Sequence, residues 1–72
     1  MTEPRPRFEV RLDDRTTIEA YELEHLAAYV RARVRKPQEP VVDEERRLAI
    51  RAPLVLQWRR IPDHRIRQIV EL

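Results

Sequence analysis

The chain lacks cysteine, glycine and serine altogether. Without cysteine it can form neither a disulfide framework nor a thiolate zinc site, and without cysteine or serine the usual nucleophiles of covalent catalysis are missing. His25 and His64 are the only histidines, and nothing in their spacing brings them together as an acid and a base. We therefore expect a protein that is not an enzyme and that uses no metal and no cofactor.

Long apolar runs are also absent. No stretch approaches the roughly 18 apolar residues of a membrane-spanning helix, and residues 1–10 lack the apolar centre of a signal peptide. These absences predict a cytoplasmic protein that does not associate with membranes. The 72 residues have room for one domain, and a chain of this size buries only about 60% of its unfolded surface. The core must be small, so oligomerisation is a natural way to bury more surface.

Charged residues, by contrast, are abundant. They make up 39% of the chain, with 15 basic and 13 acidic residues and a net charge of +2. Fourteen of the fifteen cations are arginine, whose planar guanidinium bonds phosphate bidentately and stacks on bases better than lysine does. A GC-rich genome produces the same arginine bias without a functional meaning. Composition alone therefore permits a nucleic-acid partner without requiring one.

Residues 16–35, TTIEAYELEHLAAYVRARVR, fit two incompatible structures, and the first is a helix. Thr16 and Glu19 have the spacing of a capping box, acidic residues lie toward the start and arginines toward the end, and Pro37 follows as a stop. One apolar stripe would consist of Leu23, Leu26, Ala27, Val30 and Val34. This interpretation gives an α+β domain in which one helix over residues 17–35 packs on a small antiparallel sheet.

The second interpretation of residues 16–35 is a pair of strands. A β-branched run over residues 16–18 follows a predicted turn at residues 13–15. Residues 29–35 alternate strictly, with Val30, Ala32 and Val34 opposed to Arg31, Arg33 and Arg35. The weak point is the connection at Ala27 and Ala28, because a tight hairpin normally uses glycine, asparagine or aspartate there. Local propensity alone favours the helix.

The remaining segments are mostly strand-like. Residues 1–7 contain two prolines and form a flexible tail, so one domain spans residues 8–72, with a mobile loop at residues 36–47 (KPQEPVVDEERR). Alternation predicts strands at residues 8–12, 48–52 and 54–58. Because Pro53 interrupts the ladder, residues 48–52 form either an edge strand or the segment that leads into the next strand. Residues 65–72 fit either a short helix capped by Asp63 or a closing strand after a single turn at residues 62–65.

This order of segments resembles the small SH3-like and Sm-like barrels, in which a single turn commonly separates the last two strands. Residues 60–69, RIPDHRIRQI, also resemble the Ile-Pro-x-His-Arg-Ile ending of a small, largely archaeal domain family associated with RNA-end recognition and RNA repair. The matching residues are Ile61, Pro62, His64, Arg65, Ile66 and Ile69, and the LDDR and IEAYEL segments match loosely. Because tertiary context often overrides helix propensity, the resemblance implies a mainly β fold: a small barrel of about five strands.

In the β interpretation, Arg31, Arg33 and Arg35 project from one face of a strand. Their spacing would be about 6.6 to 6.8 Å, close to the spacing of phosphates along a single nucleic-acid strand. The alternative is a solvated face on which these cations pair with Glu19, Glu22 and Glu24 across the hairpin, with little effect on stability.

A second cluster combines an aromatic residue and a histidine with arginines, which is typical of base-stacking and phosphate-binding surfaces. It consists of Trp58, Arg59, Arg60, His64 and Arg65. Trp58 alternates in phase with Leu54 and Leu56, which predicts that it packs in the core instead. His64 lies beside a turn, where its ring can simply bond nearby backbone.

The sequence therefore predicts a non-enzymatic module that binds RNA or single-stranded nucleic acid. The candidate binding residues are Arg31, Arg33, Arg35, Arg59, Arg60, His64 and Arg65. The alternative is a protein-interaction or assembly module that does not bind nucleic acid and is homo-oligomeric through an exposed strand edge at residues 48–52 or 65–72.

Overall fold

The structure is a computed structural model that describes residues 4–39, 41–50 and 53–72. Expectations that concern residues 1–3, 40, 51 and 52 lie outside the described residues. The chain is mainly β, with one short 3₁₀ turn, η1, between the last two strands. In chain order the elements are β1 (Phe8–Leu12), β2 (Thr17–His25), β3 (Tyr29–Arg35), β4 (Val41–Asp43), β5 (Leu48–Ile50), β6 (Leu56–Pro62), η1 (Asp63–Arg65) and β7 (Ile66–Glu71).

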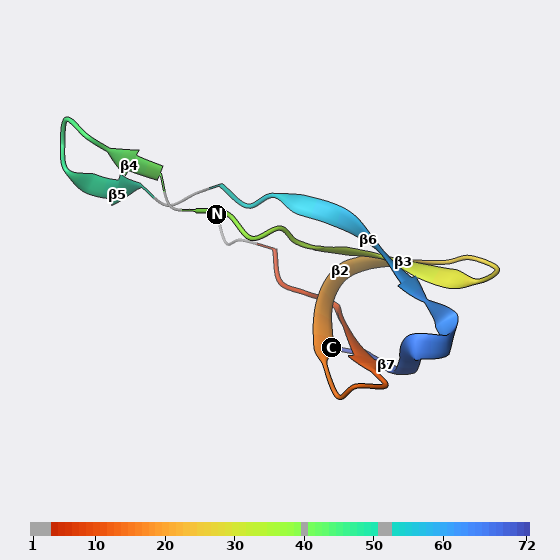
Figure 1. The fold of residues 1–72 in the computed structure, drawn as a ribbon. Helices are drawn as coiled ribbons and strands as arrows, with labels where there is room; N and C mark the ends of the chain where they lie inside the picture. Colours follow the sequence, from red (N-terminus) through yellow and green to blue (C-terminus); the bar gives the residue numbers. More distant parts are fainter. Residues whose placement is uncertain (1–3, 40, 51–52) are drawn as a thin grey trace.

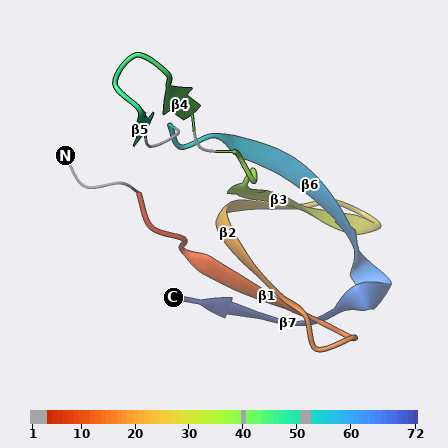
Figure 2. The same ribbon diagram turned by 60° about the vertical axis from the view of Figure 1, so that its left-hand side comes forward.

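Five strands form one antiparallel sheet in the order β6-β3-β2-β1-β7, and β4 pairs only with β5. The five-stranded sheet curls strongly (Figure 2). Its edge strands β6 and β7 do not pair with each other in the described part of the chain, so the sheet is open. The β4–β5 hairpin projects away from it (Figure 1), and the molecule measures 50 × 24 × 21 Å.

Residues 16–35 form strands, so the helical alternative is wrong. β2 and β3 are joined by a short turn, closed by a hydrogen bond of 3.0 Å from the Leu26 N–H to the Tyr29 carbonyl. The turn is made without glycine, asparagine or aspartate. The alternation predicted for residues 29–35 is confirmed, since Val30, Ala32 and Val34 are buried while the arginines between them are not. Burial of this apolar row against the sheet outweighs local helix propensity.

A β-bulge in β2 changes which residues face the core. Ala20 pairs with Val34 and Glu22 pairs with Arg33, so Tyr21 is an extra residue in the ladder. Before the bulge Ala20 faces the core, and after it Leu23 does. Because side chains alternate along a strand, a shift of one residue moves each side chain to the opposite face. The bulge therefore places Glu22 and Glu24 on the outer face, opposite Arg33 and Arg31.

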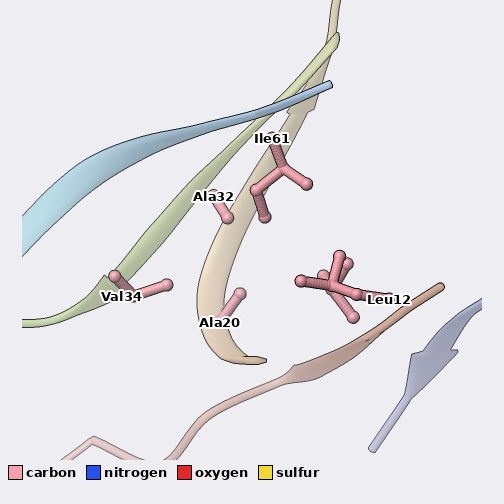
Figure 3. Close-up of a cluster of buried hydrophobic side chains, with 6 residues drawn as sticks. Leu12, Ala20, Ala32, Val34 and Ile61 are labelled. Atoms are coloured by element: carbon pink, nitrogen blue, oxygen red, sulfur yellow. The ribbon is translucent and has the colours of Figure 1, made fainter. Parts of the chain in front are cut away.

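The core lies on the concave side of the curled sheet. Six buried apolar side chains from four strands form its centre, and five of them point toward one another in Figure 3. The cluster consists of Val10, Leu12, Ala20, Ala32, Val34 and Ile61. Five further apolar side chains at the margins pack against it while remaining partly exposed: Phe8, Ile18, Leu23, Ile66 and Ile69. The core is small, as the chain length predicts.

The C-terminal segment is a turn followed by a strand, so the alternative of a helix over residues 65–72 is wrong. η1 (Asp63–Arg65) connects β6 to β7, and β7 pairs with β1. The strand expected over residues 54–58 begins later, at Leu56, and continues to Pro62. β7 thus returns beside β1 and leaves its other side unpaired within the described residues.

The middle of the chain forms the separate hairpin. β5 covers Leu48–Ile50 of the strand expected over residues 48–52, and residues 51 and 52 lie outside the described residues. The loop expected over residues 36–47 includes β4 and a turn at residues 44–47, while residues 36–39 have no regular structure. At the end of the expected tail, the Arg7 N–H bonds the Ala20 carbonyl at 2.9 Å.

Candidate nucleic-acid interface

The pairing of β3 with β6 brings arginines and aromatic residues onto one face. Arg33 lies opposite Trp58, Arg31 opposite Arg60, and Arg35 opposite Leu56. Side chains at directly opposed positions point to the same side of a sheet. This side faces away from the core, because Val30, Ala32 and Val34 alternate with the arginines and are buried. We call it the arginine–aromatic face, which consists of Tyr29, Arg31, Arg33, Arg35, Trp58 and Arg60.

Two rings on this face are covered by guanidinium groups. The Arg31 Cζ lies 4.2 Å from the centroid of the Trp58 ring, and the Arg33 Cζ lies 5.9 Å from it. The Arg60 Cζ lies 3.9 Å from the centroid of the Tyr29 ring. At exposed sites such contacts contribute about 0.5–1 kcal/mol each. They hold long, flexible side chains in defined positions across the two strands.

The expectation that Trp58 packs in the core is wrong, because the side chain is on the outer face and 38% exposed. The inward residue of β6 is Ile61, which lies opposite Val30 and is only 4% exposed. Trp58 is three residues away from Ile61 and therefore points to the other side of the strand. Leu56 and Trp58 do alternate in phase, but they lie opposite Arg35 and Arg33 of β3, so this apolar row belongs to the outer face.

Two arginines of the face are already paired with carboxylates of β2. The Arg31 guanidinium lies 3.4 Å from a carboxylate oxygen of Glu24, and that of Arg33 lies 3.5 Å from one of Glu22. Both of these expected ion pairs are present, whereas Glu19 lies opposite Glu9 of β1. All four paired side chains are between 38% and 54% exposed. Exposed pairs of this kind contribute at most about 1 kcal/mol and exchange readily for other anions.

Of the remaining candidate residues, only Arg35 and Arg60 belong to the arginine–aromatic face. Arg35 is exposed at the end of β3. Arg59 pairs with the buried Ala32 and therefore projects from the side of β6 opposite to Trp58 and Arg60. His64 is exposed within η1. The structure thus gathers four of the seven candidates, Arg31, Arg33, Arg35 and Arg60, and separates the other three from them. Tyr29 is a face residue that the sequence analysis did not select, although it alternates in phase with the arginine row.

Arg65 is held by the β1–β2 turn instead. Its guanidinium lies 3.7 Å from Asp13 and 3.4 Å from Asp14. Hydrogen bonds from the Thr16 side chain and backbone N–H, the latter at 3.0 Å, lower the pKa of Asp14, and the charge of Arg65 lowers it further. The carboxylate therefore stays ionised and ties η1 to the turn. These pairs are as exposed as those of Arg31 and Arg33, and they place the Arg65 guanidinium at the β1–β2 turn.

Comparisons with models of known protein families, with curated proteins and with solved structures give no match to this chain. Within the described ranges, no three histidine, aspartate or glutamate side chains lie together as potential metal ligands. The described residues contain no helix that is long and apolar enough to cross a membrane. The chemistry of the arginine–aromatic face is therefore the main guide to function.

Proposed function

We propose that the protein is a non-enzymatic module that binds RNA or single-stranded nucleic acid through the arginine–aromatic face. The observation that carries the proposal is the exposed Trp58, flanked by the guanidinium groups of Arg31 and Arg33. The half-exposed tryptophan, together with the guanidinium plane of Arg31 that lies over it, offers a π surface on which any base can stack. The neighbouring arginines can bond the phosphates of the same strand. Duplexes present their bases already stacked, so a single strand suits this surface better.

The carboxylates of Glu22 and Glu24 compete with phosphates for the arginines. Because both ion pairs are exposed, each carboxylate can be displaced at small cost when a phosphate approaches. Arg60 forms no ion pair with any described residue and stacks only on Tyr29. Arg35, which is exposed, also has no ion pair with a described residue. Arg35 and Arg60 are thus the cations of the face that are available for a phosphate without displacing a carboxylate.

The sharpest test compares two neighbouring arginines that point to opposite sides of β6. Arg60→Ala removes a charge from the arginine–aromatic face, and Arg59→Ala removes the same charge from the other side. Binding of a fluorescein-labelled single-stranded RNA, measured by anisotropy at several salt concentrations, should weaken in Arg60→Ala. The slope of log K against log salt should become less negative by about 0.7, because one phosphate contact is lost. Arg59→Ala should bind like the unchanged protein.

A second variant tests stacking separately from charge. Trp58→Leu should lower the affinity by about tenfold or more, because a base stacked on an aromatic ring contributes roughly 1–3 kcal/mol. Its salt slope should not change, since no cation is removed. Equal losses in Arg59→Ala and Arg60→Ala, or full affinity in Trp58→Leu, would contradict binding at this face. Absence of binding by the unchanged protein would reject the function itself.

We also propose that the sheet is of the small SH3-like or Sm-like type. The support is the strand order, in which the two edge strands follow one another in the chain and are joined by the single turn η1. The resemblance of residues 60–69 to the RNA-end-recognition family agrees with an RNA partner. In this chain, however, Ile61 belongs to the core and Arg65 to a turn contact, so the segment also has a structural explanation.

A protein-interaction or assembly module is the second candidate function. It is favoured by β7, which pairs with β1 along one side and with no other described strand. An unpaired edge can accept a further strand from another chain. Light scattering alongside the RNA titration separates the two candidates. A monomer with salt-sensitive RNA binding supports the first, and a stable oligomer that ignores RNA supports the second.

A further inference from the structure

A small cavity lies where the β1–β2 turn meets β7, away from the arginine–aromatic face. Its volume is about 230 Å³. Three of its six lining residues are arginines, and none belongs to β3 or β6. The lining consists of Arg11, Leu12, Arg15, Thr17, Arg67 and Gln68. Three arginines beside one cavity make its surroundings favourable for an anion.

Irregular backbone occurs at two of these arginines. Arg15 has φ of 69°, a left-handed conformation that glycine or asparagine normally adopts. Arg67 is the extra residue of a bulge in β7, because Arg11 pairs with Gln68 whereas Leu12 pairs with Ile66. Bulges re-aim side chains relative to a regular strand. Both irregularities therefore lie beside the same cavity.

The charges of the cavity are only partly compensated. The Arg11 guanidinium lies 3.5 Å from a carboxylate oxygen of Glu9 and donates a hydrogen bond of 3.2 Å to the Gln68 side chain. These contacts fix its position and balance its charge. Arg15 and Arg67 form no ion pair with any described residue. The cavity is thus lined by two arginines without an ion pair to a described residue, Arg15 and Arg67, and by Arg11, whose charge Glu9 balances.

We propose that this cavity binds a small phosphate-bearing anion that carries at least two negative charges. Guanidinium groups bond phosphate oxygens in pairs and suit this chemistry better than that of a monovalent anion. The cavity is smaller than the roughly 300–1,000 Å³ typical of drug-sized ligands, which agrees with a group of this size. The site is separate from the proposed nucleic-acid interface, so it is a second anion site and does not depend on the first.

The test uses inorganic pyrophosphate as the probe, measured by isothermal titration calorimetry. Arg15→Gly removes a guanidinium and also relieves the left-handed backbone. Its affinity for pyrophosphate should fall at least tenfold while the melting temperature stays the same or rises. Arg47→Gly is the matched control, because Arg47 is the other described non-glycine residue with positive φ, at 54°, and it lies in the β4–β5 turn. This variant should keep full affinity. Arg67→Gln should lose affinity as Arg15→Gly does.

Sulfate at matched ionic strength distinguishes a specific site from general attraction to a basic protein. Sulfate that binds as tightly as pyrophosphate, or equal affinities of Arg15→Gly, Arg47→Gly and the unchanged protein, would overturn the proposal. A labelled RNA strand tests whether the phosphate comes from nucleic acid instead. Saturating pyrophosphate should leave RNA affinity unchanged, and displacement of the RNA would refute a separate site. Arg60→Ala should bind pyrophosphate normally, so the two proposals can fail independently.

Discussion

The orientation of β6 makes a quantitative prediction about stability. Ile61 is 4% exposed and packs in the core, whereas Trp58 is 38% exposed on the outer face. Replacing a buried isoleucine by alanine costs about 2–5 kcal/mol, because it removes apolar contacts and leaves a cavity. Replacing Trp58 by threonine, which suits an edge strand, should cost about 1–2 kcal/mol, mainly through two lost cation–π contacts. Ile61→Ala should therefore be the more damaging variant.

The size of this effect is large for a chain of 72 residues. At 0.05–0.15 kcal/mol per residue, the free energy of unfolding is roughly 4–11 kcal/mol. Each kcal/mol shifts the melting temperature of such a small domain by about 4–8 °C. Ile61→Ala should thus melt about 8 °C or more below the unchanged protein, by circular dichroism at 218 nm, a wavelength typical of β structure. If Trp58→Thr proved the less stable variant, Trp58 would face inward and the register of β6 would be refuted.

Two further predictions concern side-chain contacts. In a double-mutant cycle with Arg31→Ala and Trp58→Leu, the coupling free energy from urea unfolding should be about 0.5–1 kcal/mol, and a value near zero would deny the stack seen at 4.2 Å. The second concerns pH, because the pKa of Asp14 is lowered on folding. The contribution of Asp14 to the free energy of unfolding is therefore present above its ordinary pKa of 3.8, and it is lost as the pH falls through the lower pKa of the folded protein. Asp14→Asn should abolish this part of the acid dependence, and an unchanged acid profile would contradict it.

The local alternation of β3 was the most predictable part of the fold. Apolar and arginine residues alternate without interruption over residues 30–35, and the structure buries the apolar set and leaves the arginines accessible. The row of Arg31, Arg33 and Arg35 follows directly. The choice between helix and strands was not decided by local signals, because capping and charge placement favoured the helix. Burial of Val30, Ala32 and Val34 depends on partners elsewhere in the chain, which no local rule contains.

The candidate site was only partly predictable, because its other half comes from a distant strand. The stacking of Arg31 on Trp58 depends on the register of β3 against β6, and that register depends on the inward position of Ile61. The sequence does contain one indication of the bulge in β2. Its inward residues change phase between Ala20 and Leu23, and such a change indicates a bulge. The contact of Arg65 with the β1–β2 turn bridges about fifty residues and has no local signature.

The bulge at Tyr21 also determines how the arginine–aromatic face responds to salt. It places Glu22 and Glu24 beside the arginine row, so four arginines and two carboxylates leave a net charge of +2 on the face. If the ion pairs persist in the complex, about two phosphates are neutralised and the slope of log K against log salt for a single strand is about −1.4. If phosphates displace both carboxylates, four arginines act and the slope approaches about −2.8. The double variant Glu22→Gln, Glu24→Gln should therefore strengthen RNA binding. Because it leaves Arg31 and Arg33 without carboxylate partners, it should move a shallow slope of log K against log salt toward the steeper value.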